Sequence, residues 1–443
     1  MNKVYETVIG IEVHVELNTK TKMFCRCSAD YFGKKPNTHT CPVCLGIPGA
    51  LPYINEEAIK KCMRIGLALN CSVNEQSYFE RKNYFYPDLA KGYQISQLVK
   101  PLNINGQLEV EDESGVTSII RINRVHQEED TGKLTHVGSE TLIDFNRSGV
   151  PLVEIVTEPD FHSSAQVKDY AKKLQQIFRY LGVSNADMER GDMRLEANVS
   201  VRPVGQKELP PYRVELKNIN SFRFMQAAIE YEIKRQIWVL ERGETLTQET
   251  RGWNETKKET YLQRSKEEAH DYRYFPEPDL PELKIDTLQL RELLRKQLPE
   301  LPAQKVKRFF DEYGLNKAQI AMMADSKEMA EFFEEAVKVG SKYKVESIKV
   351  ANFIINKKVN IEDINPEQLI KDIVNQNTGM ISDEKELEKV VKEVIDENSK
   401  AVEDFKAGKE VALQVIIGSV MKKTKGKAEI KKVKEILEGV LKS

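Results

Sequence analysis

The 443-residue sequence predicts an α+β protein, with a largely antiparallel sheet in the first part of the chain and helices in the rest. Up to about residue 280, short runs of alternating polar and apolar residues, typical of strands, are interrupted by a few helical patterns. These runs do not follow a strict strand–helix–strand order, which disfavours a parallel sheet. Pro276, Pro278 and Pro281 then interrupt the chain, and the strand pattern is lost beyond them.

The elements of the first part follow from this alternation and from helix-capping residues. The predicted strands are residues 7–17, 117–127, 141–146, 151–157, 192–202 and 212–219. One predicted helix begins after Ser163 and ends at Gly182, and a second begins after Ser221 and ends at Gly243. Serine can accept hydrogen bonds from the free amides of a first helical turn, and glycine readily ends a helix.

The rest of the chain predicts amphipathic helices. Apolar residues at helical spacing fill 287–345, a polar stretch follows at 358–383, and a last helical block covers 384–441. That block contains a Lys-rich segment at 421–427, followed by further lysines at 431–434. Such a segment is either a solvated helix face or a local site for phosphate groups, and the sequence leaves both open.

Composition limits the function without naming it. Charged residues make up 31% of the chain and nearly cancel, at a formal net charge of −2, so a nucleic acid would have to meet a local basic patch. The N-terminus lacks the basic start and apolar core of a signal peptide, and no apolar run reaches membrane-spanning length. Cys62 and Cys71 lie in an apolar stretch and are expected to be reduced core thiols. These features predict a cytoplasmic protein.

Four of the six cysteines predict a metal site. They form two short pairs, Cys25-Arg-Cys27 and Cys41-Pro-Val-Cys44, within a segment of twenty residues. Zinc binds four thiolates tetrahedrally, and each pair supplies two ligands from one turn. The alternative is two unrelated pairs of reduced thiols. Because a closed shell of four ligands leaves no position for a substrate, the predicted zinc ion stabilises a loop and takes no part in a reaction.

Acidic side chains and a histidine share one face of the first predicted strand. Glu12, His14 and Glu16 alternate with apolar residues and stand roughly 7 Å apart, so neighbouring side chains could converge on one ion. A solvent-exposed face would explain this pattern equally well. Later segments favour the ion, because they place further acids on other predicted strands.

Three later segments carry these acids. His126-Gln-Glu-Glu-Asp130 lies at the end of a predicted strand. Glu154 interrupts an apolar run, where a carboxylate is costly unless it is paired or bound to metal. Asp192 and Arg194 share one face of the strand at 192–202. Hard oxygen ligands with an occasional histidine suit Mg²⁺, which in turn binds nucleotide phosphates.

Cations that could contact phosphate are also present. They are Lys217, Arg251, Arg264, Lys266 and Arg273, each of which would otherwise form a surface ion pair. The sequence contains no GxxxxGK[ST] loop, kinase catalytic loop or serine nucleophile elbow. The residues alone therefore predict a metal-binding and phosphate-binding sheet on a frame held by zinc.

Seven long motifs are spread in order over residues 7–280. Two of them are Val8-Ile-Gly-Ile-Glu-Val-His-Val-Glu-Leu17 and Asp271-Tyr-Arg-Tyr-Phe-Pro-Glu-Pro-Asp279. The others lie at 41–50, 86–96, 144–154, 198–202 and 217–223. In these motifs the chain resembles the GatB/GatE family, the B-type subunits of aspartyl/glutamyl-tRNA amidotransferases. The helices at 287–345 and the Lys-rich tail are similar to the family less specifically.

The resemblance implies three domains. They are a cradle-shaped catalytic domain at 1–285 that contains the zinc knuckle at 25–44, a helical domain at 286–357, and a small helical tail domain at 358–443. The tail domain would engage tRNA, and between Asn375 and Asp383 it is predicted to lack a helix-sized piece.

The resemblance also implies an activity, that of an ATP-dependent ligase that forms a carbon–nitrogen bond. ATP would phosphorylate the side-chain carboxylate of Glu-tRNA(Gln) or Asp-tRNA(Asn), and ammonia would displace the phosphate to give the amide. The sequence lacks a serine–lysine amidase signature, so glutamine would be hydrolysed by another chain. The implied partners are that A-type amidase subunit and a small C-type subunit, in a heterotrimer that binds tRNA(Gln) or tRNA(Asn).

The resemblance assigns residues to ATP, Mg²⁺ and Zn²⁺ chemistry. Glu12, His14, Glu154 and one or both of Glu128 and Glu129 would form the catalytic Mg²⁺ site. The predicted contacts to phosphate or substrate are Lys217, Arg223, Arg273, Asp192 and Arg194. The competing hypothesis is a non-catalytic, zinc-containing RNA-binding scaffold. The strand carboxylates disfavour it, because a scaffold has no use for acids beside phosphate.

Overall fold

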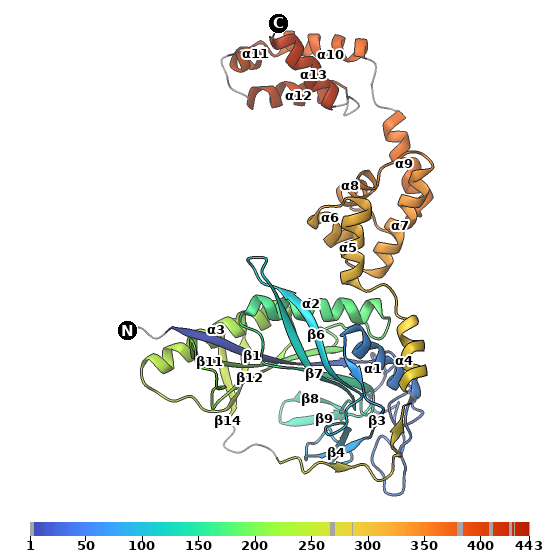
Figure 1. Ribbon diagram of the computed structural model, residues 1–443, viewed down its shortest axis with the longest axis vertical. Helices are drawn as coiled ribbons and strands as arrows, with labels where there is room; N and C mark the ends of the chain where they lie inside the picture. Colours follow the sequence, from blue (N-terminus) through green and yellow to red (C-terminus); the bar gives the residue numbers. More distant parts are fainter. Residues whose placement is uncertain are drawn as a thin grey trace. The chain divides into compact units, whose positions relative to one another are not determined.

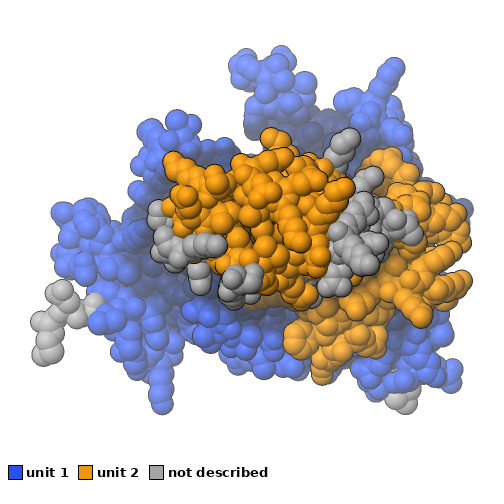
Figure 2. All heavy atoms as spheres, turned by 90° about the horizontal axis from the view of Figure 1, so that it is seen from above, with its two compact units in different colours: residues 1–305 blue, residues 306–443 orange. Residues whose placement is uncertain are grey.

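The computed structural model describes residues 4–265, 271–285, 287–378, 384–406, 411–424, 428 and 430–442. The chain divides into two compact units, residues 1–305 and 306–443, which have different colours in Figure 2. Among the described residues, no helix combines the length and the hydropathy needed to cross a bilayer.

A nine-stranded sheet forms the centre of the first unit (Figure 1). In spatial order its strands are β14 (Glu259–Ser265), β13 (Glu249–Asn254), β12 (Val214–Ile219), β11 (Met193–Pro203), β1 (Tyr5–Glu16), β10 (Pro151–Thr157), β7 (Thr117–Glu129), β6 (Asn103–Glu111) and β2 (Ser72–Val73). Only the β12–β13 pair is parallel. The predicted α+β fold with a largely antiparallel sheet is confirmed.

Helices α1 (Glu56–Ala68), α2 (Ser164–Tyr180) and α3 (Phe222–Glu241) pack on one face of this sheet. Figure 1 shows α2 and α3 running along that face. Ser163 caps α2 as predicted, by accepting a hydrogen bond from the Gln166 amide, whereas Ser221 makes no side-chain cap bond to α3. Val13 and Val15 of β1 are fully buried in the resulting core. The polar side chains that alternate with them therefore point to the opposite face.

Short strands from distant parts of the chain form three smaller sheets. They are β4 (Glu80–Asn83), β5 (Tyr93–Ser96) and β15 (Phe275–Pro276) in one sheet, the pair β8 (Lys133–Val137) and β9 (Glu140–Asp144), and the pair β3 (Gln76–Ser77) and β16 (Leu283–Lys284). Figure 1 shows β4, β8 and β9 on the side away from α2 and α3. Arg81 of β4 fixes the segment around β15, because its guanidinium donates two 2.7 Å hydrogen bonds to the buried carboxylate of Glu277.

The described part of the second unit is helical and contains two separate hydrophobic cores. Its helices are α5 (Pro302–Tyr313), which begins in the first unit, α6 (Lys317–Met323), α7 (Lys327–Ser341), α8 (Ser347–Lys357), α9 (Pro366–Thr378), α10 (Glu384–Glu397), α11 (Ser399–Lys406), α12 (Val411–Lys423) and α13 (Ile430–Lys442). Helix α4 (Thr287–Lys296) belongs to the first unit. Phe309 and Phe333 lie in one core, and Leu387 and Leu437 in the other. The predicted helical C-terminal part is thus confirmed.

The details of this part differ from the sequence-based expectation. The stretch at 358–383, noted in the sequence only as polar, contains helix α9, one face of which is buried through Leu369, Ile370 and Ile373. Leu294 of α4 joins the core of the first unit, which extends to Lys305. The three predicted domain limits stay predictions.

Two further expectations fall partly on residues that the structure does not describe. The predicted shortening of the tail includes 379–383, and the Lys-rich segment includes 425–427; both ranges lie outside the described residues. Within the described part of the Lys-rich segment, Lys423 pairs with Glu393 at 3.1 Å and Glu397 at 2.6 Å. This lysine therefore behaves as part of a solvated, ion-paired helix face.

Candidate metal and substrate site

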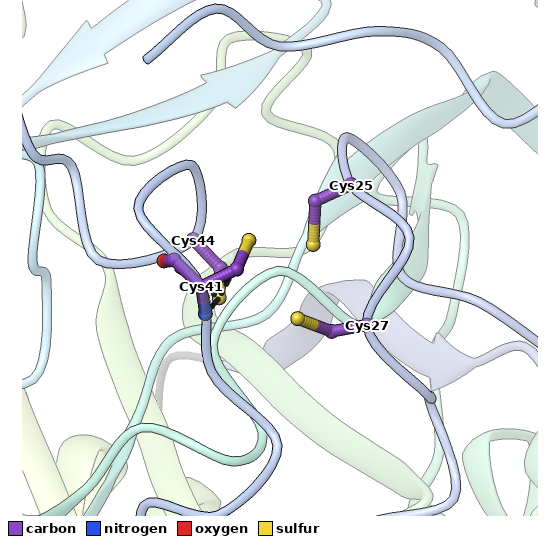
Figure 3. Close-up of side chains that lie close together, drawn as sticks. All are labelled: Cys25, Cys27, Cys41 and Cys44. Carbon is purple, nitrogen blue, oxygen red and sulfur yellow. Dashed lines mark hydrogen bonds between the residues drawn. The ribbon is translucent and has the colours of Figure 1, made fainter. Parts of the chain in front are cut away.

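The four predicted zinc ligands lie together in the first unit. One ligand atom from each of Cys25, Cys27, Cys41 and Cys44 falls within 4.8 Å of every other. Figure 3 shows the two pairs approaching from different segments of the loop region. Cys41 Sγ and Cys44 Sγ are 3.9 Å apart. Thiolates at about 2.3 Å from one zinc ion stand about 3.8 Å apart in a tetrahedron, so this donor set fits such an ion.

The charge environment favours a thiolate in this cluster. A hydrogen bond from Cys25, supported by the Lys22 ammonium 3.6 Å away, outweighs burial and lowers the pKa of Cys44 to about 4. The same pairing raises the pKa of Cys25. Metal ligands of this type must be deprotonated, and a metal ion would lower the remaining pKa values further.

A second cluster lies on the polar face of the nine-stranded sheet. His14 of β1 pairs in register with Glu154 of β10, and Glu154 pairs with His126 of β7. One ligand atom from each of His14, Glu128 and Glu154 lies within 4.8 Å of the others, and we call these three residues the acid triad. His14 Nε2 is 3.7 Å from Glu154 Oε2. Nitrogen and carboxylate oxygens at these distances can share one divalent cation.

Strand alternation separates the two candidate acids of β7. Glu128 points to His14 and Glu154, the other members of the triad. Ser96 Oγ donates to Glu128 Oε1 at 2.5 Å, and Gln94 Nε2 donates to its Oε2 at 3.1 Å. Glu129 points to the other face, where it contacts the Lys91 ammonium and accepts a 3.0 Å hydrogen bond from the Ile95 amide. The geometry therefore favours Glu128 over Glu129 as a ligand.

Glu12 lies beside the triad and also borders a cavity. Asn198 Nδ2 donates to its Oε1 at 3.0 Å. Burial, and then the negative charges of Glu154 and Glu196, raise the pKa of Glu12, which indicates a site that would gain from a cation. The cavity has a volume of about 440 Å³ and is lined by residues of β1, β10 and β11 and of the 209–213 loop.

His126 is a site residue that the sequence reasoning did not select. Its Nε2 lies 3.3 Å from Glu154 Oε2 and 3.5 Å from Glu128 Oε1, and its Nδ1 is buried without a hydrogen-bond partner in the described structure. Burial lowers its pKa, but the two carboxylates outweigh that effect and raise it. Its position two residues before Glu128 on one strand face was the available signal.

Lys82 of β4 was also missed, because β4 is distant in sequence. Its Nζ lies 4.0 Å from Glu128 Oε1 and 5.3 Å from the centre of the Tyr272 ring. Burial raises the pKa values of Glu128 and Glu154, but nearby cations outweigh it: Lys82 chiefly lowers that of Glu128, and His126 that of Glu154. Both carboxyl groups are therefore ionised at neutral pH and available as ligands.

Three of the predicted phosphate contacts are found in other ion pairs. Arg194 donates a 2.5 Å hydrogen bond to Asp130, and Asp192 lies 3.6 Å from Arg190. Lys217 contacts Glu196 at 2.8 Å and Glu215 at 3.1 Å. Arg194 lies on β11, Asp192 directly precedes that strand and Lys217 lies on β12, and each of these partners is a residue outside the triad.

The other two predicted contacts are exposed. Arg223 lies over the Phe224 ring at 4.9 Å. The Arg273 side chain is 83% exposed and lies 3.5 Å from Asp271. Within the described residues, neither Arg223 nor Arg273 contacts a residue of the triad. The assignment of these two arginines as phosphate contacts stays a prediction.

Comparison with known proteins places this geometry in a family. Residues 7–291 match the model of the GatB/GatE catalytic domain, and residues 347–441 match the model of the GatB domain. The chain belongs to the GatB/GatE family. The first of these matches includes both cysteine pairs, the triad and Glu12, and the resemblance noted in the sequence is confirmed.

Similar curated proteins are named as the B subunit of aspartyl/glutamyl-tRNA(Asn/Gln) amidotransferase. The protein of Carboxydothermus hydrogenoformans is 46% identical over 483 aligned positions that cover 99% of each chain. That of Persephonella marina is 46% identical over 479 positions, covering 99% of this chain and all of the relative. That of Thermotoga sp. strain RQ2 is 52% identical over 343 positions, covering 76% of this chain and 70% of the relative. The first two alignments are longer than the 443-residue chain, so those relatives carry residues that this chain lacks.

Proposed function

We propose that this chain is the catalytic B subunit of a tRNA-dependent amidotransferase. It would phosphorylate the side-chain carboxylate of Glu-tRNA(Gln) or Asp-tRNA(Asn) with ATP, and ammonia would then displace the phosphate to give Gln-tRNA(Gln) or Asn-tRNA(Asn). The observation that carries this proposal is the acid triad of His14, Glu128 and Glu154, on the polar sheet face of a GatB-type catalytic domain.

The chemistry explains why such a site is needed. A carboxylate is a stabilised anion and resists attack by ammonia, so it must first become an acyl phosphate. Phosphoryl transfer depends on positioning and on charge stabilisation, for which Mg²⁺ supplies neutralisation of the phosphate oxygens. His14, Glu128 and Glu154 would hold this ion, with Glu12 next to it.

The cavity beside Glu12 is our candidate for the ATP site. Its volume of about 440 Å³ is within the range of small-molecule sites, and Glu12 and Asn198 are among its lining residues. If nucleotide binds there, Glu12 of β1 and Glu154 of β10 would hold Mg²⁺, which would supply neutralisation of the phosphate charge. The cysteine cluster would hold zinc and stabilise the loop between β1 and α1.

We further propose the partners and the location that the family resemblance implies. The ammonia would come from glutamine, hydrolysed by an A-type amidase subunit in a complex with a small C-type subunit. The complex would act on charged tRNA in the cytoplasm.

The test is incubation of the purified chain, assembled with its partner subunits, with ATP, Mg²⁺, Glu-tRNA(Gln) or Asp-tRNA(Asn), and ammonium in place of glutamine. We expect ATP hydrolysis that requires the charged tRNA, together with formation of the amidated aminoacyl-tRNA. Glu154→Gln should abolish both activities, and Glu109→Gln, on a strand of the same sheet, should leave them unchanged. Binding of tRNA without ATP turnover would instead support the competing hypothesis of a non-catalytic RNA-binding scaffold.

A further inference from the structure

Two cations beside the acid triad leave hydrogen-bond donors unused within the part of the chain that the structure describes. Lys82 Nζ approaches Glu128 only to 4.0 Å and donates no hydrogen bond to a described residue. Arg124 has a buried Nε without a partner, and its guanidinium forms no ion pair within the described part of the chain. A lysine offers three donors and an arginine five, so both side chains can still bind an anion.

A purely structural role explains these two cations poorly. Lys217, which balances charge on β12, touches its acid directly, at 2.8 Å from Glu196. Glu128 is already held by Ser96 and Gln94 and does not depend on Lys82 for its position. A guanidinium with a buried, unpaired donor carries a desolvation cost that a bound anion would remove.

The register of β7 directs Arg124 toward the site. Arg124 pairs with Val156, and two residues later His126 pairs with Glu154, so both side chains leave the strand on the same face. A register shift between Val156 and Thr157 allows Ile122 to lie in the core while Arg124 points to the opposite face.

Tyr274 marks the space between these groups. Burial raises the pKa of its phenol to about 12, and the charged groups that act on it are Lys82, Glu128, Glu154 and Arg124. The phenol is thus within electrostatic reach of both cations and of two acids of the triad. Neither Lys82 nor Arg124 is among the residues that line the cavity beside Glu12.

We propose that Lys82 and Arg124 bind the side-chain carboxylate of the aminoacyl group that is to be phosphorylated. This inference rests on the proposed function and assigns the second substrate within the same site. A substrate carboxylate that approaches Glu128 and Glu154 would be repelled unless positive charge lay beside it. Arginine pairs with carboxylates through two parallel hydrogen bonds, and the Lys82 ammonium adds a second charge from β4.

The test compares the wild-type complex with Lys82→Gln and Arg124→Gln. Arg121→Gln is the matched control, because Arg121 lies on the same strand but is exposed and paired with Asp160 at 2.7 Å. Four quantities are measured: the KM values for Glu-tRNA(Gln) and for ATP, and the affinities for Glu-tRNA(Gln) and for Gln-tRNA(Gln), which carries a neutral amide. Thermal unfolding and metal content show whether each variant is folded.

We expect each site variant to raise KM for Glu-tRNA(Gln) by roughly ten- to hundredfold, the range for loss of a charge-assisted hydrogen bond. KM for ATP should stay within about twofold of the wild type, because neither cation lines the cavity proposed for ATP. The wild-type preference for Glu-tRNA(Gln) over Gln-tRNA(Gln) should shrink in both variants, and Arg124→Lys should restore part of it.

Other outcomes overturn the inference. A raised KM for ATP with an unchanged KM for Glu-tRNA(Gln) would mean that these cations hold nucleotide phosphates. Equal losses of affinity for Glu-tRNA(Gln) and Gln-tRNA(Gln) would indicate contact with the tRNA backbone, and behaviour like Arg121→Gln would indicate no substrate contact. A wild-type complex without ATP turnover that depends on charged tRNA would refute the proposed function, and the inference with it.

Discussion

Replacing Ser96 by alanine should weaken the Mg²⁺ site without removing any of its ligands. Ser96 Oγ donates a 2.5 Å hydrogen bond to Glu128 Oε1, and both residues are only 1% exposed. Hydrogen bonds to charged groups contribute about 1.5–3 kcal/mol, and loss of such a partner typically lowers metal affinity about 10–100-fold. Because Gln94 still holds the other oxygen at 3.1 Å, we expect the lower end of this range.

The assay is the Mg²⁺ dependence of ATP turnover by the assembled complex with charged tRNA. In Ser96→Ala, the half-saturating Mg²⁺ concentration should rise about tenfold, while kcat at saturating Mg²⁺ stays within about threefold of wild type. Ser72→Ala, at an exposed position on β2, is the control and should match wild type. A Ser96→Ala complex with wild-type Mg²⁺ dependence would refute the assignment of Glu128 as a ligand oriented by Ser96.

Three further predictions concern metal content, pH and an internal ion pair. The wild type should retain about one equivalent of zinc after dialysis, and Cys41→Ser should lose it and become more sensitive to proteolysis near its N-terminus; a folded wild type without metal would reject the zinc site. In metal-free protein, His126 and the cations around it outweigh burial and hold the pKa of Glu154 well below its usual 4.5. Its contribution to the free energy of unfolding is therefore present above about pH 4.5 and lost as pH falls below that value, so urea denaturation of Glu154→Gln should show a weaker acid dependence than wild type. Arg81→Ala should destabilise the first unit by about 3–5 kcal/mol, because it leaves the buried Glu277 carboxylate unpaired. The double variant with Glu277→Gln should recover part of that loss in thermal unfolding, and no recovery would contradict the stated cause.

Strand alternation made part of the site predictable. The spacing of Glu12 and His14 against Val13 and Val15 is a local property of the chain, and the structure places the two sets on opposite faces as expected. The cysteine spacing is equally local, and its four sulfurs come together. The same rule could have found His126, which shares a face with Glu128.

Residues brought in by chain segments far apart could not be predicted in this way. Lys82 reaches the triad because β4 pairs with β5, which places Lys82 opposite Gln94, a hydrogen-bond partner of Glu128. The segment around β15, almost two hundred residues later in the chain, pairs with the other edge of β4. Within that later segment, residue type alone favoured Arg273 as the cation at the site. The structure leaves Arg273 in solvent, whereas its neighbour Tyr274 is partly buried within electrostatic reach of Glu128 and Glu154. Neither local spacing nor charge specifies which of two adjacent side chains faces inward; the pairing partner does.

The register shift beside Arg124 has a consequence for how the sheet tolerates insertions and deletions. β10 passes from Val156 to Thr157 while β7 passes from Arg124 to Ile122, and β6 makes the same extra step between Ile104 and Gly106. Losing Asn123 alone would bring β7 into step with β10 but out of step with β6. Losing Asn123 together with its counterpart Asn105 would preserve both pairings. At this position β6 and β7 should therefore gain or lose residues only together, one in each strand.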